Sequence, residues 1–207
     1  MPKKQIVSVL TATALSIIAF VLFKVISLYF ASWYGETAQE AFSVASSRQF
    51  GKTLIIVIIC IIIYLVSSFS NPKYTKIIYI VCGIISCIAG AYICMNTSIY
   101  FSGSAEIQAI AAPMVRLLAF TYGIAFPLFY LLQCILACGT DFKDNIINQV
   151  ISCACFVVLY FVIGFISARL IGNIGMSITV SACIAVVVSI FPSLNLENIK
   201  SQIKNKD

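Results

Sequence analysis

Histidine is absent from this chain, and charged residues make up only 10% of its 207 positions. Without histidine, neither a Ser–His nor a Cys–His nucleophile pair can form, and the usual nitrogen ligand of zinc is missing. The chain also lacks a glycine-rich phosphate-binding loop, which argues against ATP hydrolysis by the common motif. We therefore predict a protein that is not an enzyme, with no catalytic residues, no metal site and no cofactor.

The low content of charge also excludes an ordinary soluble protein. Hydrophobic residues reach 61% of the chain, which leaves too little polar surface to keep a folded domain dissolved. The formal net charge is +6, but the basic residues do not gather beside aromatic residues as a phosphate-tracking surface requires. The composition predicts an integral protein of the cell (inner) membrane, with the lipid bilayer as a partner and no nucleic-acid partner.

Six apolar runs, separated by short polar breaks, fill nearly the whole chain. A spanning helix needs roughly 20 apolar residues, and in lipid each span must satisfy its backbone hydrogen bonds internally. The predicted spans are Ile6–Trp33, Leu54–Phe69, Ile77–Met95, Ile107–Cys138, Ile146–Ala168 and Ile174–Phe191. We predict an all-α bundle of transmembrane helices over residues 1–192, followed by a basic cytoplasmic tail over residues 193–207.

The distribution of lysine and arginine predicts the orientation of the bundle, because these residues accumulate in cytoplasmic loops. With the N-terminus inside, the inner segments hold most of the basic residues: Lys3, Lys4, Lys73, Lys76, Lys143, Lys200, Lys204 and Lys206. The outer segments hold Arg48, Lys52 and Arg169. We therefore predict that both termini are cytoplasmic.

The connections between the predicted spans are too short to fold alone. The run Tyr34–Lys52 is the most polar internal stretch, and we expect it to hold a loop and an amphipathic approach to the second span. The break Cys138–Asn148 is typical of a compact turn. Gly139 suits a helix C-terminus there, and Asp141 or Asp144 suits the next helix N-terminus.

The nine cysteines all fall within the predicted spans. Cys134 and Cys138 share a helix face, and this spacing suits a soft metal, but no acidic residue is placed to complete such a site. Disulfides need an oxidising compartment and a close approach of two Cα atoms. We interpret the cysteines as small apolar packing residues.

The third and fourth spans carry residues that affect helix packing. Gly83, Ser86 and Gly90 form a stripe of small residues, which predicts an internal packing face or, as the alternative, the seam of a dimer. The fourth span contains Pro113 and Pro127, and each proline removes a backbone hydrogen bond and bends a helix. These two interruptions either accommodate packing or mark a hinge or a helix that lines a site.

Two charged residues, Lys24 and Arg116, fall inside the spans, where a charge is costly and usually faces a cavity or a partner. Arg116 either meets an anionic group or snorkels toward the outer interface, and Lys24 either faces a cavity or reaches a polar gap. With Pro127 and Gln133, they are the predicted substrate-binding residues. No acidic residue lies in the middle of a span, which argues against autonomous ion-coupled transport.

The order of these features resembles one six-helix half of a multidrug and toxic compound extrusion (MATE) transporter, in the superfamily that also includes polysaccharide and lipid flippases. The stretches that carry the resemblance are YGETAQEAFSVA (Tyr34–Ala45), NPKYTKIIYI (Asn71–Ile80), LLQCILACGTDFKDNIINQVISC (Leu131–Cys153) and LIGNIGMSITVSA (Leu170–Ala182). Pro127 also stands where the fourth span of that family usually has a proline. The likeness covers all the predicted spans in order.

The chain departs from that family in two ways. Family members have two such halves related by a pseudo-twofold axis, and many carry a first-span aspartate where this chain has Ser27. The resemblance implies a half-size efflux antiporter or flippase that moves small-molecule or lipid-linked substrates, as a homodimer or with a second transporter half. The alternatives are a degenerate half without transport of its own, and a substrate-binding subunit that works with a separate ATPase.

Overall fold

The structure is a computed structural model that describes residues 2–67, 69, 72–96, 104–138 and 142–189. Within these residues the regular elements are all helical, and no strand is present. The predicted basic tail over residues 193–207 lies outside the described residues, as do Gly139 and Asp141. The all-α prediction is therefore confirmed for the described part of the chain.

The helices follow the predicted apolar runs in order. They are α1 (Pro2–Ser32), α2 (Glu36–Ser67), α3 (Pro72–Met95), α4 (Ala105–Phe120), the π-helix η1 (Thr121–Ala125), α5 (Phe126–Leu136), α6 (Phe142–Leu170) and α7 (Ile174–Val188). The segments α4, η1 and α5 join end to end, so they form one long span with an irregular middle.

The described residues contain five helical segments that are long and apolar enough to cross a membrane. Their outer faces carry large exposed apolar side chains, such as Ile55 on α2, Ile85 on α3 and Val158 on α6. Apolar surface of this extent is stable when it faces lipid. The fold therefore indicates a multi-pass integral membrane protein.

The last helix, α7, is shorter than the other spans. It has 15 described residues, which corresponds to about 22 Å of helix, against a hydrocarbon core of roughly 30 Å. The end of the predicted sixth span, from residue 190 to Phe191, lies outside the described residues. Five long spans and one shorter apolar helix are what the described chain contains.

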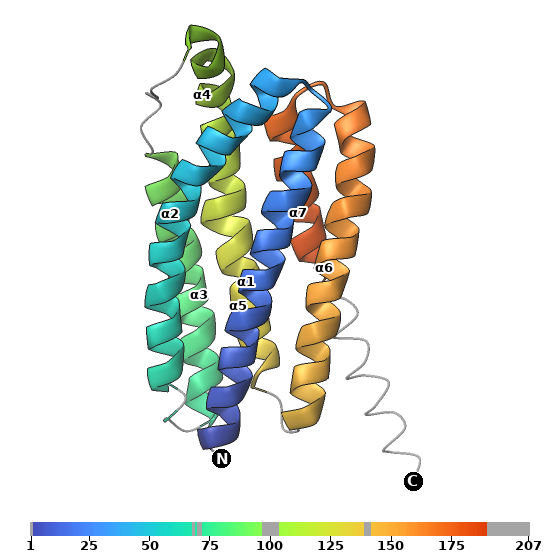
Figure 1. The fold of residues 1–207 in the computed structure, drawn as a ribbon. Coiled ribbons are helices and arrows are strands. Elements are labelled where there is room, and N and C mark those ends of the chain that lie inside the picture. The colour runs from blue at the N-terminus through green and yellow to red at the C-terminus, as the bar shows by residue number, and fades with distance from the viewer. Residues whose placement is uncertain (1, 68, 70–71, 97–103, 139–141, 190–207) are drawn as a thin grey trace.

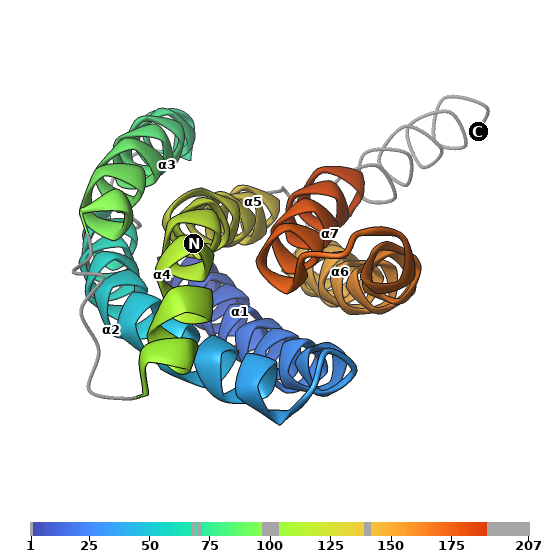
Figure 2. The ribbon, with the colours of Figure 1, turned by 90° about the horizontal axis from the view of Figure 1, so that it is seen from above.

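The broken span α4–η1–α5 lies in the middle of the bundle (Figures 1 and 2). Seen from above, α2 and α3 curve around one side of it, α6 and α7 lie on the other side, and α1 crosses between them (Figure 2). In its most apolar stretch 67% of the residues are buried, against at most 33% in the other four long spans. The core of the protein is therefore built around this span.

Helix α2 begins about five turns earlier than the predicted second span, because the polar stretch Tyr34–Lys52 is itself almost entirely helical. Only a tight turn separates α1 from α2, and Gly35 supplies the positive φ of 101° that this turn requires. The first half of α2 buries small and aromatic residues at helical spacing, among them Ala38, Ala41 and Phe42. The predicted loop is therefore limited to the turn at Tyr34 and Gly35, and the predicted amphipathic approach to the second span is confirmed.

The stripe of small residues on α3 faces the interior. A Cβ added to Gly83 would collide with the side chain of Leu131 on α5, and one added to Gly90 would collide with the backbone carbonyl of Gly123 in η1. Both glycines are buried. The small residues therefore form an internal packing face, as predicted, and allow the backbones of α3 and η1 to approach closely.

Candidate functional site

The irregular middle of the central span is a π-helical turn over Thr121–Ala125. The N–H of Phe126 donates to the carbonyl of Thr121, five residues back instead of four. Pro127 follows directly and has no N–H to continue the ladder. A π-turn beside a proline leaves backbone carbonyls without their regular helical donors, and such turns are frequent at functional sites.

Side chains from neighbouring helices donate hydrogen bonds to the carbonyls of this span. The Thr53 hydroxyl of α2 donates to the carbonyl of Tyr122 at 2.9 Å, which is the acceptor that an N–H at position 127 would reach in the π register. Gln49 Nε2, one turn earlier on α2, donates to the carbonyl of Val115 at 2.8 Å. On the other side, the Thr179 hydroxyl of α7 donates to the carbonyl of Leu117 at 3.1 Å. The break is therefore held between α2 and α7.

The structure contains one helical break in this span where the sequence predicts two. Helix α4 runs through Pro113 without a change of helical type, whereas the π-turn precedes Pro127. Pro113 is exposed, so its ring occupies the outer side of the helix, while Pro127 is buried against the neighbouring helices. The buried proline, Pro127, therefore accompanies the change from α-helix to π-turn, and the exposed proline, Pro113, does not.

A buried hydroxyl pair joins α1 to α6 near the core. Ser27 Oγ and the Tyr160 hydroxyl share a hydrogen bond of 2.6 Å, and Ser27 also donates to the carbonyl of Phe23 at 2.7 Å. Both residues are fully buried. At this position of the first span the structure therefore holds a neutral pair, and no carboxylate.

The predicted residue Gln133 lies on α5 and is completely buried, with 0% of its surface exposed. Neither atom of its side-chain amide has a hydrogen-bond partner among the described residues. Gln149 on α6 lies beside it, and its Nε2 donates to the carbonyls of Ser8 and Gln133 at 3.2 and 3.3 Å, while its own Oε1 lacks a described partner. A buried amide without a partner is destabilising, so this junction of α1, α5 and α6 contains a costly group.

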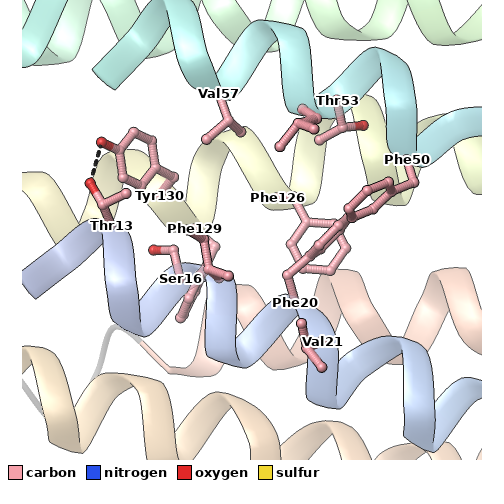
Figure 3. A pocket seen from close by; sticks show the side chains of 12 residues that line it. Thr13, Ser16, Phe20, Val21, Phe50, Thr53, Val57, Phe126, Phe129 and Tyr130 are labelled. Carbon is pink, nitrogen blue, oxygen red and sulfur yellow. Dashed lines mark hydrogen bonds between the residues drawn. The ribbon is translucent and has the colours of Figure 1, made fainter. Parts of the chain in front are cut away.

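A pocket of about 140 Å³ lies between α1, α2 and α5 (Figure 3). Aromatic side chains form much of its wall: Phe20 from α1, Phe50 from α2, and Phe126, Phe129 and Tyr130 from α5. The remaining lining residues are Thr13, Ser16, Ile17, Val21, Thr53, Leu54 and Val57. The pocket is therefore mainly apolar and lies beside the irregular part of the central span.

Lys24 lies at the edge of this pocket. Its ammonium lies 5.7 Å from the centre of the Phe50 ring, and Phe50 stacks on Phe20 with ring centres 5.0 Å apart. Arg116, in contrast, is exposed on α4, and no hydrogen bond among the described residues joins it to Pro127 or Gln133. The four predicted residues thus do not form one site. Pro127 and Gln133 share α5, Lys24 borders the pocket, and Arg116 stands apart.

Sequence reasoning missed Gln49, Thr53, Thr179 and Tyr160. Each is a single polar residue near or within an apolar run, and this pattern could have marked them as residues that contact another helix. Their acceptors are far away in the chain, for example 69 residues for Thr53 and Tyr122. The pairing itself follows only from the packing of the helices.

The described residues contain no group of three or more acidic, histidine or cysteine side chains that could hold a metal ion. All nine cysteines are free, and Cys134 and Cys138 are joined only through a weak contact from the Cys138 thiol to the Cys134 carbonyl at 3.5 Å. The burial of these cysteines supports their interpretation as packing residues.

Comparison with protein-family models, with curated proteins and with solved structures finds no match to this chain.

Proposed function

We propose that this chain is a half-size membrane transporter, a MATE-like efflux protein or flippase that moves organic or lipid-linked substrates and works as a dimer. In this proposal all six apolar runs cross the membrane, both termini are cytoplasmic, and two copies in the same orientation rebuild a twelve-span architecture. The substrate then binds between the halves, near the middle of the membrane.

The discontinuity of the most buried span carries this proposal. Transporters form their sites at helices whose backbone is irregular at membrane depth, and the π-turn over Thr121–Ala125 is irregular at the centre of the bundle. The unpaired amide of Gln133 lies on the same span, beyond the break. A costly buried amide is explained if a second arrangement of the helices gives it partners.

The role of the irregular turn before Pro127 is tested by a matched pair of proline substitutions, Pro127→Ala and Pro113→Ala. The protein is reconstituted in vesicles, and two activities are measured: movement of a fluorescent phospholipid between leaflets and efflux of ethidium. We expect Pro127→Ala to slow whichever of the two activities the unaltered protein shows, because alanine restores a backbone N–H to the interrupted hydrogen bonds of the central span. Pro113→Ala, on the exposed side of a regular helix, is expected to keep the rate.

The substrate-binding residues are tested in the same assay with Lys24→Ala and Arg116→Ala. Unchanged transport of every probe in both variants would overturn their assignment to substrate binding. If the unaltered protein moves neither probe, alone or with a second transporter half, the transport proposal itself fails for these substrate classes.

A second candidate is a transporter half without independent transport. The neutral pair of Ser27 and Tyr160 favours it, because a hydroxyl pair cannot carry the charge change on which carboxylate-coupled antiport depends. The substitution Ser27→Asp separates the two candidates. If the unaltered protein shows no transport and the Ser27→Asp variant gains proton-dependent efflux, the result would support the second candidate function.

A further inference from the structure

The pocket between α1, α2 and α5 has the properties of a lipid site. We propose that it binds part of one acyl chain of an anionic phospholipid from the surrounding membrane, with Lys24 directed to the headgroup. This role of Lys24 differs from the substrate binding proposed above, since the lipid stays at the protein surface whether or not a substrate is moved.

The wall of the pocket offers almost no free polar group. The Thr13 and Tyr130 hydroxyls share a hydrogen bond of 3.0 Å (Figure 3), and Thr53 donates to the Tyr122 carbonyl at 2.9 Å. Ser16 Oγ is buried and has no described partner, so a single hydroxyl remains among apolar and aromatic side chains. A polar ligand would lose its hydrogen bonds to water without replacement, whereas a hydrocarbon chain would not.

The size and the mouth of the pocket fit a segment of a chain. Its volume of about 140 Å³ is close to that of apolar cavities of roughly 150 Å³ that bind benzene, so it accepts part of an acyl chain and not a whole lipid. Three of its lining residues, Ile17, Val21 and Leu54, are about half exposed on the outer face of the bundle. The remainder of a chain in the pocket would therefore continue along a face suited to lipid.

Lys24 favours a lipid whose headgroup carries a negative charge. It follows Phe20 by one turn of α1, and its ammonium lies against the Phe50 ring of the pocket wall. No carboxylate among the described residues forms an ion pair with it. Lys24 stands eight residues before the end of α1 at Ser32, about 12 Å of helix, so the flexible side chain can extend toward the headgroup region. Basic side chains between transmembrane helices attract anionic headgroups.

Photocrosslinking tests this site directly. The protein is reconstituted in vesicles containing equal amounts of phosphatidylglycerol and phosphatidylcholine, and one of the two carries a diazirine on an acyl chain. After irradiation, the labelled peptides are mapped by mass spectrometry. We expect labels on residues 13–21 and 50–57. We also expect about five-fold more label from phosphatidylglycerol than from phosphatidylcholine, because one lysine near an anionic headgroup contributes about 1 kcal/mol.

Two variants separate the charge from the cavity. Lys24→Gln is expected to lower phosphatidylglycerol labelling to the level of phosphatidylcholine, and Val57→Phe, which fills the pocket, is expected to lower the labelling by both lipids. The matched controls are Lys76→Gln, an exposed lysine on α3, and Ile55→Phe, an exposed neighbour on α2 that does not line the pocket. Both controls are expected to keep the labelling pattern of the unaltered protein.

Labels spread evenly over the outer faces would overturn the site, and equal labelling by the two lipids in the unaltered protein would overturn the role of Lys24. If Val57→Phe does not fold, the label map and Lys24→Gln still decide the proposal. Because labelling needs no transported substrate, its result is independent of the transport assays.

Discussion

At the scale of single residues, the unpaired amide of Gln133 is the feature that most needs an explanation. Buried polar groups in proteins nearly always have partners, and an unsatisfied one costs about 1–3 kcal/mol. Gln133 has none among the described residues, although its neighbour Gln149 uses its Nε2 twice. A costly group buried at a junction of three helices is typical of residues kept for function and not for stability.

The substitution Gln133→Leu is expected to stabilise the protein by about 1 kcal/mol, because it removes the unpaired amide and keeps the volume. Gln149→Leu is expected to destabilise it, since the carbonyls of Ser8 and Gln133 lose a donor. Unfolding in mixed detergent micelles, followed by circular dichroism, measures both variants. A loss of stability in Gln133→Leu as large as that in Gln149→Leu would contradict this account.

The Thr53 hydroxyl supports the broken span from outside. Thr53→Val keeps the shape of the side chain but leaves the Tyr122 carbonyl without this donor, so we expect the free energy of unfolding to fall by about 1 kcal/mol. The same measurement on Thr11→Val is the control, because Thr11 is half-buried and its exposed hydrogen bond goes to the Val7 carbonyl of its own helix. Equal effects of the two substitutions would argue against a specific role of Thr53.

Sequence reasoning identified Gln133, Lys24 and Pro127 because amides, charges and prolines are conspicuous in apolar runs. It did not place them relative to one another, and the structure assigns Lys24 to a pocket edge and Gln133 to a different junction. The partners Gln49 and Thr53 were missed because the second span was expected to begin at Leu54. Residue type is readable from the sequence, whereas the contacts depend on helix packing.

At the scale of the elements, α3 packs directly against the irregular turn η1. Gly90→Ala places a methyl group against the carbonyl of Gly123, and this backbone oxygen cannot turn away as a side chain would. Overpacking of this kind costs about 1–3 kcal/mol, so we expect a clear loss of stability in detergent.

Gly51→Ala on α2 is the matched control for Gly90→Ala. Apart from its two chain neighbours and the nearby backbone of α2 itself, no atom lies within 4 Å of a Cβ at Gly51, so the substitution meets open space. Removing a glycine from a helix interior stabilises it by roughly 0.5–1 kcal/mol, and we expect an equal or higher stability for this variant. A harmless Gly90→Ala would contradict the tight packing of α3 against η1.

The sequence predicted the order of the helices and located the irregular span, but it misjudged where some helices begin. Helix α2 begins at Glu36 and not at Leu54, and its first turns bury polar residues such as Gln49, which a search for continuous apolar runs passes over. Helix α6 begins at Phe142 with Asp144 in its first turn, close to the helix start that the acidic residues predicted. The sequence also does not show which of the two prolines in this span accompanies a π-turn. Only the structure shows that the turn precedes the buried Pro127.

At the scale of the whole molecule, the number of crossings decides the topology. Six crossings place both termini on one side of the membrane, whereas the five long spans alone would place them on opposite sides. The inner position of most lysines predicts cytoplasmic termini. We therefore expect a fused green fluorescent protein to fluoresce at both ends and a fused alkaline phosphatase to be inactive at both. Active phosphatase at the C-terminus would show that α7 does not cross.

The proposed assembly of this chain with a second copy of itself, or with another transporter half, is tested by the mass of the complex in lipid. The protein is extracted with its surrounding lipid into polymer-bounded discs and measured by native mass spectrometry. We expect a complex with twice the 22.6 kDa mass of the chain, or one chain joined to a second transporter half. A monomer that remains monomeric across the concentrations found in the membrane would contradict it.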